Sequence, residues 1–247
     1  MKHFLLALGA GLLALCLFAA GAHATVVIGG TRVVFPAQNG EVTVRLSNVG
    51  DTPALIEAWI DKGDPRSTPD KVDTPFLITP PLFRMEAHKD QSLRILATSP
   101  HLPADRESLF WLNVLEVPPR PSGPQAADKN MLQFAVRSRL KLFYRPAKLP
   151  GDPLKATGEL SWKAGHGGQG IVLDAHNPSP YYITISKLSL DVGGKPYTAD
   201  TGMVAPFGDL QLAVKGLTGI PAAGTVLSYT TINDYGAADA HKGTVAP

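Results

Sequence analysis

Histidines, cysteines and paired carboxylates are the side chains that most often carry catalysis or hold a metal ion. The sequence has no H-E-x-x-H pattern, no Cys/His ligand spacing, no G-x-S-x-G and no phosphate-binding glycine loop. Five histidines follow residue 24 and are scattered: His88, His101, His166, His176 and His241. We therefore expect a protein that is not an enzyme, with no catalytic residue, metal site or cofactor. A metal-binding β-sandwich enzyme is kept as a less favoured alternative.

Arg32 and Lys141 could do a different kind of chemistry, because an arginine fork and a mobile lysine ammonium can bind one carboxylate together. By residue type alone they are as easily explained as solvated surface charges. The whole chain carries 23 Lys and Arg against 21 Asp and Glu. This near balance gives no indication of a nucleic-acid or membrane-surface partner.

The first 24 residues have the pattern of a cleaved secretory signal peptide. Lys2 and His3 precede an apolar run over 4–20, and Ala22-His23-Ala24 supplies the small residues of a cleavage site. A transmembrane anchor fits these flanks less well. The only cysteine, Cys16, lies inside this segment, so we expect a mature chain from Thr25 without disulfides.

The next 120 residues have the period-2 alternation of half-buried strands. The dipeptide Asn39-Gly40 is a strong turn signal, and Pro80-Pro81 must interrupt or kink its strand. About seven short strands suggest an immunoglobulin-like sandwich. The expected strands are Val26–Phe35, Glu41–Asn48, Ala54–Asp61, Phe76–Met85, Ser92–Thr98, Leu109–Val117 and Met131–Tyr144.

A linker rich in proline over Pro146–Pro153 precedes a second, more weakly patterned β-domain. We place the first domain at 25–147 and the second at 148–247, and expect the small, polar end Gly236–Pro247 to fray. The strands expected in the second domain are Gly158–Trp162, Gly170–His176, Tyr181–Val192, Gly208–Val214 and Val226–Ile232.

The long strand Met131–Tyr144 has two interpretations. Leu132, Phe134 and Val136 share one parity, and polar residues occupy much of the other. The apolar row could face the core of its own domain, or it could lie on an edge strand offered to a partner by β-augmentation. The pattern alone does not separate these interpretations.

Four stretches, in order, resemble the periplasmic pilus-chaperone family of the chaperone–usher pathway. Together they run through nearly all of the chain after residue 24. The stretches are Thr31–Pro36, Leu102–Pro119, Leu140–Pro146, and the pair Asn177–Tyr182 and Ile232–Gly236. The short segment Pro118–Lys129 and the lack of a cysteine pair resemble the short-loop branch of that family.

The resemblance implies an all-β protein of two immunoglobulin-like sandwiches in a boomerang arrangement. It implies that Arg32 and Lys141 anchor the C-terminal carboxylate of a pilus subunit in the cleft between the domains. It further implies that Leu132, Phe134 and Val136 form a donor strand that completes the subunit's sandwich. Three more residues match an inter-domain ion network: Glu107, Arg145 and Asp234.

The partners implied are pilus subunits and an outer-membrane usher, in the periplasm of a Gram-negative cell, and the free protein could form a homodimer. The expected function is to bind, fold and cap subunits and deliver them to the usher. A pilus subunit or adhesin is the alternative. It is less favoured because subunits usually have one incomplete domain and a cysteine pair, whereas this chain has two domains' worth of strands.

Overall fold

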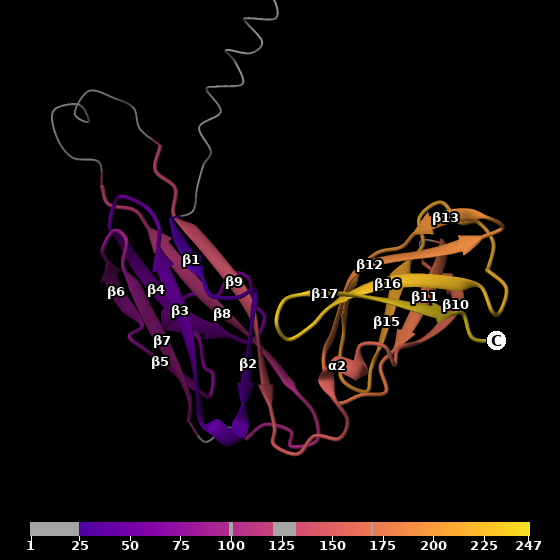
Figure 1. Cartoon of the computed structure of the whole chain (residues 1–247), viewed down its shortest axis with the longest axis horizontal. Helices are drawn as coiled ribbons and strands as arrows, with labels where there is room; N and C mark the ends of the chain where they lie inside the picture. The colour runs from indigo at the N-terminus through magenta and orange to yellow at the C-terminus, as the bar shows by residue number, and fades with distance from the viewer. Residues whose placement is uncertain (1–24, 99–100, 121–131, 169) are drawn as a thin grey trace, which may run out of the picture.

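The computed structural model describes residues 25–98, 101–120, 132–168 and 170–247. The expected signal peptide and most of the Pro118–Lys129 segment lie outside these residues. Within them the chain forms two β-sandwich lobes that meet at an angle (Figure 1). The expected all-β class is confirmed. The two domain limits at 147 and 148 stay a prediction.

The first lobe consists of two facing sheets and two short 3-10 turns. All neighbouring strands are antiparallel except β2 and β9. One sheet has the order β1 (Val26–Ile28), β3 (Glu41–Asn48), β7 (Asp90–Ala97), β5 (Phe76–Thr79). The other has the order β2 (Arg32–Pro36), β9 (Val136–Arg145), β8 (Ser108–Val117), β4 (Ala54–Asp61), β6 (Leu82–Met85). The 3-10 turns are η1 (Ala37–Asn39) and η2 (Pro69–Lys71).

Alternate residues of these strands fill the core between the two sheets, as the period-2 pattern requires. Phe35, Leu46, Leu112 and Leu142 are fully buried there, two of them on β2 and β3 and two on β8 and β9. The expected turn at Asn39-Gly40 is present, because η1 ends at Gly40 in the left-handed region. The core therefore fixes both strands that carry the candidate basic residues.

Two expected strands are each divided between the two sheets. Val26–Phe35 becomes β1 and β2, because Gly29-Gly30 lets the chain cross over with Gly30 at a φ of 137°. Phe76–Met85 becomes β5 and β6, because Pro80-Pro81 cannot continue a ladder. Alternation alone does not show which sheet a strand joins, so the sequence pattern predicts one strand in place of each pair.

Strand β9 begins later than the expected Met131–Tyr144. Its ladder with β8 starts at Val136, whereas residues 132–135 are in no strand and Met131 lies outside the described residues. On its other side β9 pairs with β2 only from Lys141 to Arg145. Its first half therefore has one edge that no described strand covers.

The second lobe also has two sheets, and the segment joining it to the first contains a single short helix. Asp152 caps this helix by accepting a hydrogen bond from the Leu154 amide at 2.9 Å. The helix is α2 (Pro153–Ala156). One sheet is β10 (Ser161–Gly167), β11 (Gly170–His176), β15 (Asp209–Ala213). The other is β13 (Lys195–Thr198), β12 (Ile183–Val192), β16 (Val226–Ile232), β17 (Ala238–Thr244), with β14 (Gly202–Val204) also on β12.

The expected fraying of Gly236–Pro247 is wrong. Every residue of β17 pairs with β16, and Val245 beyond it is buried. Gly243 packs against Trp162 so closely that an added Cβ would lie 3.1 Å from the indole. Backbone pairing and close packing order this segment, and neither is visible in its small, polar composition.

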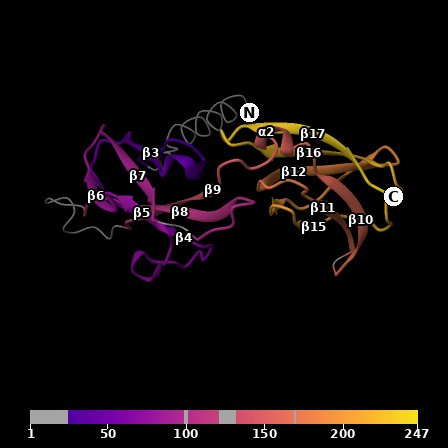
Figure 2. The same cartoon turned by 90° about the horizontal axis from the view of Figure 1, so that it is seen from below.

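The lobes touch through strand ends and turns. Figures 1 and 2 both show the linker-side part of β9 next to the second lobe. The Glu107 amide donates to the Pro180 carbonyl at 2.9 Å. Gly236, in the turn between β16 and β17, lies so near Thr31 that an added Cβ would be 2.5 Å from its hydroxyl. These contacts place Thr31, the residue before β2, beside the turn that follows β16.

Candidate functional site

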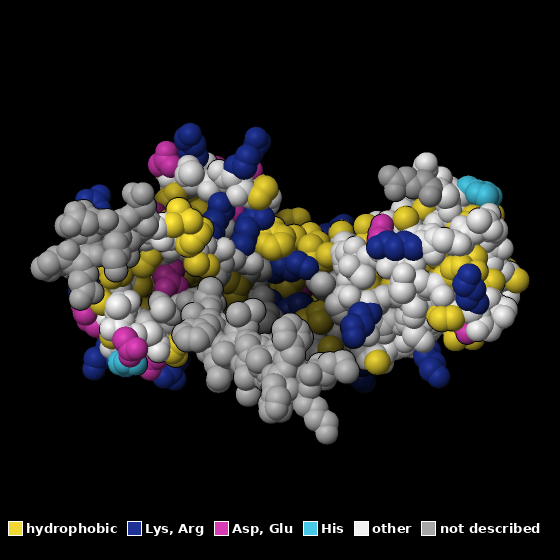
Figure 3. All heavy atoms as spheres, turned by 90° about the horizontal axis from the view of Figure 1, so that it is seen from above, with side chains coloured by type: hydrophobic (Ala, Val, Ile, Leu, Met, Phe, Trp, Pro, Cys, Tyr) yellow, Lys and Arg dark blue, Asp and Glu magenta, His cyan; other side chains and the backbone are white. Residues whose placement is uncertain are grey.

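Arg32 and Lys141 lie side by side at the junction of the lobes. The parallel register of β2 and β9 pairs their Cα atoms directly. Arg32 Nη1 donates to the Ile232 carbonyl at 2.8 Å, and Lys141 Nζ donates to Thr184 Oγ1 at 3.0 Å. Each cation therefore rises from the first lobe and touches the second. Figure 3 shows Lys and Arg side chains close to where the lobes meet.

The two cations are poorly compensated where they lie. Burial, followed by the nearby Arg32 charge, lowers the pKa of Lys141 to about 8. Burial also lowers the pKa of Arg32, against the opposing charge of Asp234. Neither side chain has a carboxylate partner within salt-bridge distance among the described residues, and Arg32 Nε is buried without a hydrogen bond. An added carboxylate would supply the negative charge that these two cations lack.

Leu132, Phe134 and Val136 are exposed rather than buried. Their exposed fractions are 80%, 69% and 41%. Large apolar side chains in such a row indicate a surface that another molecule covers. We call residues 132–136 the donor segment. Of the two interpretations left open by the pattern, this exposure favours the row that faces away from its own core.

The uncovered edge of β9 borders a hollow. The hollow has a volume of about 370 Å³ and lies where the chain crosses from β1 to β2. Its lining comes from β1 and the crossing segment and from the facing part of β9: Val26, Ile28, Gly30, Thr31, Ser138, Arg139 and Leu140. A strand laid along this edge would meet unpaired backbone groups of β9 and space for its side chains.

Glu107, Arg145 and Asp234 form one ion network. Arg145 Nε lies 2.7 Å from Glu107 Oε1, and its two Nη atoms meet the Asp234 carboxylate at 2.7 and 2.9 Å. Glu107 also accepts the Tyr182 amide at 2.7 Å. Burial raises the pKa of Glu107 despite the opposing effect of Arg145. The network crosses from Glu107, just before β8, and Arg145, at the end of β9, to the second lobe.

A second polar network, which sequence analysis missed, lies on the outer face of β4, β8 and β9. Asp61 is buried at its centre and accepts hydrogen bonds from Arg139 at 2.6 Å and Asn113 at 2.8 Å. Arg137 and Arg139 lie over the rings of Trp59 and Trp111 at 4.7 and 4.4 Å. The alternation of Arg137, Arg139 and Lys141 was the signal available in the sequence.

The described residues contain no group of three His, Cys, Asp or Glu side chains that could hold a metal ion. His88 and His176 each lie beside a single aspartate, at 3.0 and 2.9 Å. Within the same residues no helix is long and apolar enough to cross a membrane.

Comparison with known proteins places this architecture in a family. Residues 25–150 match the N-terminal domain of the pili and flagellar-assembly chaperone PapD, and residues 155–243 match the C-terminal domain of the pili assembly chaperone PapD. Two immunoglobulin-like lobes with these domains define a pilus-assembly chaperone. The chain belongs to the PapD family of pili assembly chaperones.

Individual relatives agree over almost the whole length. The chain is 43% identical over 244 residues to chaperone protein FimB/FhaD of Bordetella pertussis, covering 97% of this chain and 95% of that one. It is 42% identical over 222 residues to the probable fimbrial chaperone YadV of Escherichia coli, covering 90% of each. It is therefore a fimbrial chaperone rather than an enzyme, and the alternative of a pilus subunit is not favoured.

Solved structures give the same result. The crystal structure of the YadV chaperone matches 90% of this chain and all of that one, with 39% identity and a TM-score of 0.76. A chain from the complex of Salmonella enterica SafA pilin with the SafB chaperone matches with 30% identity and a TM-score of 0.73, over 92% of this chain and 99% of that one.

Proposed function

We propose that this chaperone holds a pilus subunit by two linked contacts, an anchor for the subunit's C-terminal carboxylate and a strand added to its open sandwich. The observation that carries the proposal is the exposed apolar row that leads into β9 at Val136, where one strand edge is uncovered. One of the matched structures is a chaperone in complex with a pilin, which supports a subunit as the partner.

The anchor is formed by Arg32 and Lys141. A carboxylate between them would accept hydrogen bonds from both cations in a partly buried place, where charge-assisted bonds are strong. Ile232 and Thr184 already hold the two side chains, so their conformations need little ordering on binding. This supports a carboxylate, rather than a neutral chain end, as the group recognised.

The strand is added at the donor segment. Leu132, Phe134 and Val136 would enter the groove of the incomplete subunit, and the free edge of β9 would supply backbone hydrogen bonds. Complete burial of each apolar side chain is worth roughly 1.5–3 kcal/mol by transferred area. Part of this offsets the cost of association.

Several further features belong to the same proposal. The ion network of Glu107, Arg145 and Asp234 sets the angle between the lobes, and thereby the width of the cleft. The mature protein begins at Thr25 and works in the periplasm, which the expected signal peptide supports. Cell fractionation that recovers the protein only from the cytoplasm would contradict this location.

The subunit complex is delivered to an outer-membrane usher, and the free chaperone covers its apolar row by forming a homodimer. Analytical ultracentrifugation of the free protein tests the second statement, because a monomer at all concentrations would exclude it. Pull-down of the chaperone–subunit complex with purified usher tests the first. A complex that the usher does not retain would exclude delivery.

The anchor is tested by coexpression with a pilus subunit from the same genome. Arg32→Ala and Lys141→Ala should each abolish the soluble complex, and the unprotected subunit should be degraded. Arg94→Ala, on β7 of the other sheet, is a matched control that should have no effect. Undiminished copurification with both anchor variants would exclude the assignment.

The group recognised is tested with a synthetic peptide of the subunit's last strand. A free carboxylate at its end should bind, and the same peptide with a terminal amide should bind far more weakly. Equal affinity of the two peptides would show that Arg32 and Lys141 do not recognise the carboxylate.

A further inference from the structure

The residues that alternate with the apolar row of the donor segment are tied to the first lobe. Leu132, Phe134 and Val136 are exposed on one parity. On the other parity, the side chains of Gln133 and Arg137 both make hydrogen bonds to the first lobe. The segment thus has one apolar side that faces solvent and one polar side whose side chains are fastened by hydrogen bonds to the first lobe.

Gln133 fastens the segment where a backbone ladder cannot form. The ladder between β8 and β9 ends at the pair Glu116 and Val136. Beyond it the chain from β8 continues as Pro118-Pro119, and proline has no N–H to donate to a neighbouring strand. Gln133 Nε2 donates to the carbonyls of Pro118 and Pro119, each at 2.8 Å. Its two N–H groups thereby replace the missing ladder.

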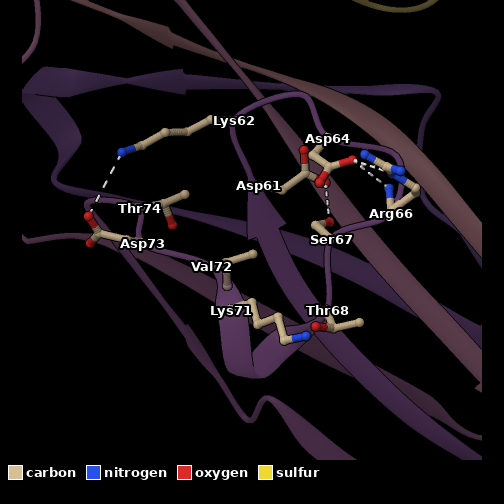
Figure 4. A pocket seen from close by; sticks show the side chains of 10 residues that line it. All are labelled: Asp61, Lys62, Asp64, Arg66, Ser67, Thr68, Lys71, Val72, Asp73 and Thr74. Atoms are coloured by element: carbon tan, nitrogen blue, oxygen red, sulfur yellow. Dashed lines mark hydrogen bonds and ion pairs between the residues drawn. The ribbon is translucent and has the colours of Figure 1, made fainter.

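Arg137 fastens the point where the segment joins β9. Its Nε and Nη2 donate to Asn113 Oδ1 at 2.9 and 2.7 Å, and Nη1 donates to the Pro65 carbonyl at 2.8 Å. Nη2 also donates to Ser67 Oγ at 3.0 Å. Ser67 in turn points at Asp61 (Figure 4). Asn113 is completely buried, so this end is joined to the buried part of the sheet.

We propose that Gln133 and Arg137 are positioning residues that hold the donor segment with its apolar row turned away from its own lobe. The inference rests on the proposed function, because it assigns to these two residues the presentation of the strand that the subunit receives. A fixed segment loses less conformational freedom on binding than a free one, so fastening raises affinity without any contact to the subunit.

The fastening is tested first in the free, full-length chaperone by amide hydrogen exchange. Gln133→Glu keeps the shape of the side chain but removes both N–H donors, and Arg137→Ala removes the fork. Both should speed exchange at residues 136–138, the first residues of the ladder with β8, with Arg137→Lys between Arg137→Ala and the natural protein. Arg84→Ala, an exposed arginine on β6 of the same sheet paired with Glu86, is the control. Unchanged exchange in Gln133→Glu and Arg137→Ala would overturn the proposal.

Presentation is tested by the affinity of each variant for the coexpressed pilus subunit. Loss of one fastening should weaken binding roughly three- to tenfold, which matches the cost of ordering one flexible side chain or short segment. Because Gln133 is exposed, Gln133→Glu should leave the melting temperature unchanged, and weaker binding by this variant cannot come from unfolding. Faster exchange combined with natural affinity would overturn the presentation role.

The result separates this inference from the function on which it rests. Truncation of the apolar row itself, as in Leu132→Ala, must weaken subunit binding if the donor segment is used at all. If Leu132→Ala binds normally, the proposed strand addition fails. If Leu132→Ala binds weakly while Gln133→Glu and Arg137→Ala bind normally, only the positioning role fails.

Discussion

At the scale of single residues, position distinguishes Arg32 and Lys141 from the other cations of the chain. Arg45, Arg84 and Arg94 lie in exposed ion pairs, whereas Arg32 and Lys141 are partly buried beside each other without a carboxylate. Their residue types are the same as those on the surface. An incoming anion would offset the desolvation cost of these two partly buried cations, and this makes them a candidate site.

The lowered pKa of Lys141 predicts a pH-dependent anchor. The pKa of Lys141 in the folded protein is about 8, below the usual 10.5, so the free chaperone loses this proton as pH rises through 8. At a pH between 8 and 10.5, unfolding restores the usual pKa and the lysine takes up a proton. A bound carboxylate favours the charged form, so binding above pH 8 must take up a proton. Affinity for the carboxylate-ended peptide should therefore fall above pH 8, by at most about tenfold per pH unit.

Isothermal titration at pH 7, 8 and 9 measures this dependence. Lys141→Arg keeps a cation whose charge does not change in that range, so its affinity should stay nearly level from pH 7 to 9. An equally steep fall in Lys141→Arg would show that another group titrates.

At the scale of elements, β9 serves two roles along its length. From Lys141 onwards it is an inner strand between β2 and β8, and Leu142 is fully buried. Between Val136 and Leu140 one of its edges is open in the described part of the sheet. The donor segment before it leaves the ladder altogether. One chain segment thus changes from a core strand to an exposed apolar row, which is the part that we propose binds the subunit.

The sequence predicts this element only in part. Its alternation correctly indicates a strand, but Leu132 and Leu142 have the same parity and opposite environments. The difference arises because Leu132 lies before the ladder with β8 begins, whereas Leu142 lies between β8 and β2, and this is a property of topology. The crossing at Gly29-Gly30 and the ordered β17 also could not be predicted from the local sequence pattern, because both depend on which strands pair. The family motifs, in contrast, predict Arg32 and Lys141 as a pair, and the structure brings these two residues side by side.

Truncation within the donor segment should affect binding and leave the fold intact. Phe134 is 69% exposed in the free protein, so Phe134→Ala should leave the melting temperature nearly unchanged. If the ring is buried in the subunit, affinity should fall roughly ten- to 150-fold, as expected for 1.5–3 kcal/mol of lost burial.

Surface plasmon resonance with the immobilised subunit gives the affinity, and differential scanning calorimetry gives the melting temperature. Leu77→Ala is the matched control, because Leu77 is similarly exposed but lies on β5 in the other sheet. A comparable loss of affinity in Leu77→Ala would argue against a specific role for the donor segment.

At the scale of the whole molecule, two lobes with separate core clusters depend on a small junction for their relative position. One apolar contact crosses it, because the buried ring of Phe143 on β9 lies against Tyr182 of the second lobe with ring centroids 5.8 Å apart. The contacts that cross the junction include those of Arg32, Lys141, Glu107 and Arg145 with the second lobe. The anchor and the ion network therefore share one interface. A change in the angle would move both cations relative to the subunit.

A double-mutant cycle on Glu107 and Arg145 tests this junction. Arg145→Ala leaves a buried Glu107 unpaired and should cost about 3–5 kcal/mol of unfolding free energy. Glu107→Gln with Arg145→Ala should cost less than the sum of the two single changes, because position 107 then carries no buried unpaired charge. The exposed pair Arg45 and Asp90 is the control, with an expected coupling of about 0–1 kcal/mol.

Urea unfolding gives these free energies, and distances between spin labels on the two lobes report the angle. A wider spread of distances in Arg145→Ala is expected if the network sets the angle. Absence of coupling, together with an unchanged distance distribution, would leave the network without that role.

Lys141 and Val136 lie on the same strand, so the strand fixes the distance between the two contacts. An extended chain rises about 3.3 Å per residue, so five residues separate Lys141 from Val136, the nearest residue of the exposed apolar row, by about 17 Å. Covalent geometry fixes this interval, and neither side chain can alter it. A client whose groove starts at another distance from its chain end cannot satisfy both contacts at once. The chaperone would therefore select its clients by length as well as by chemistry.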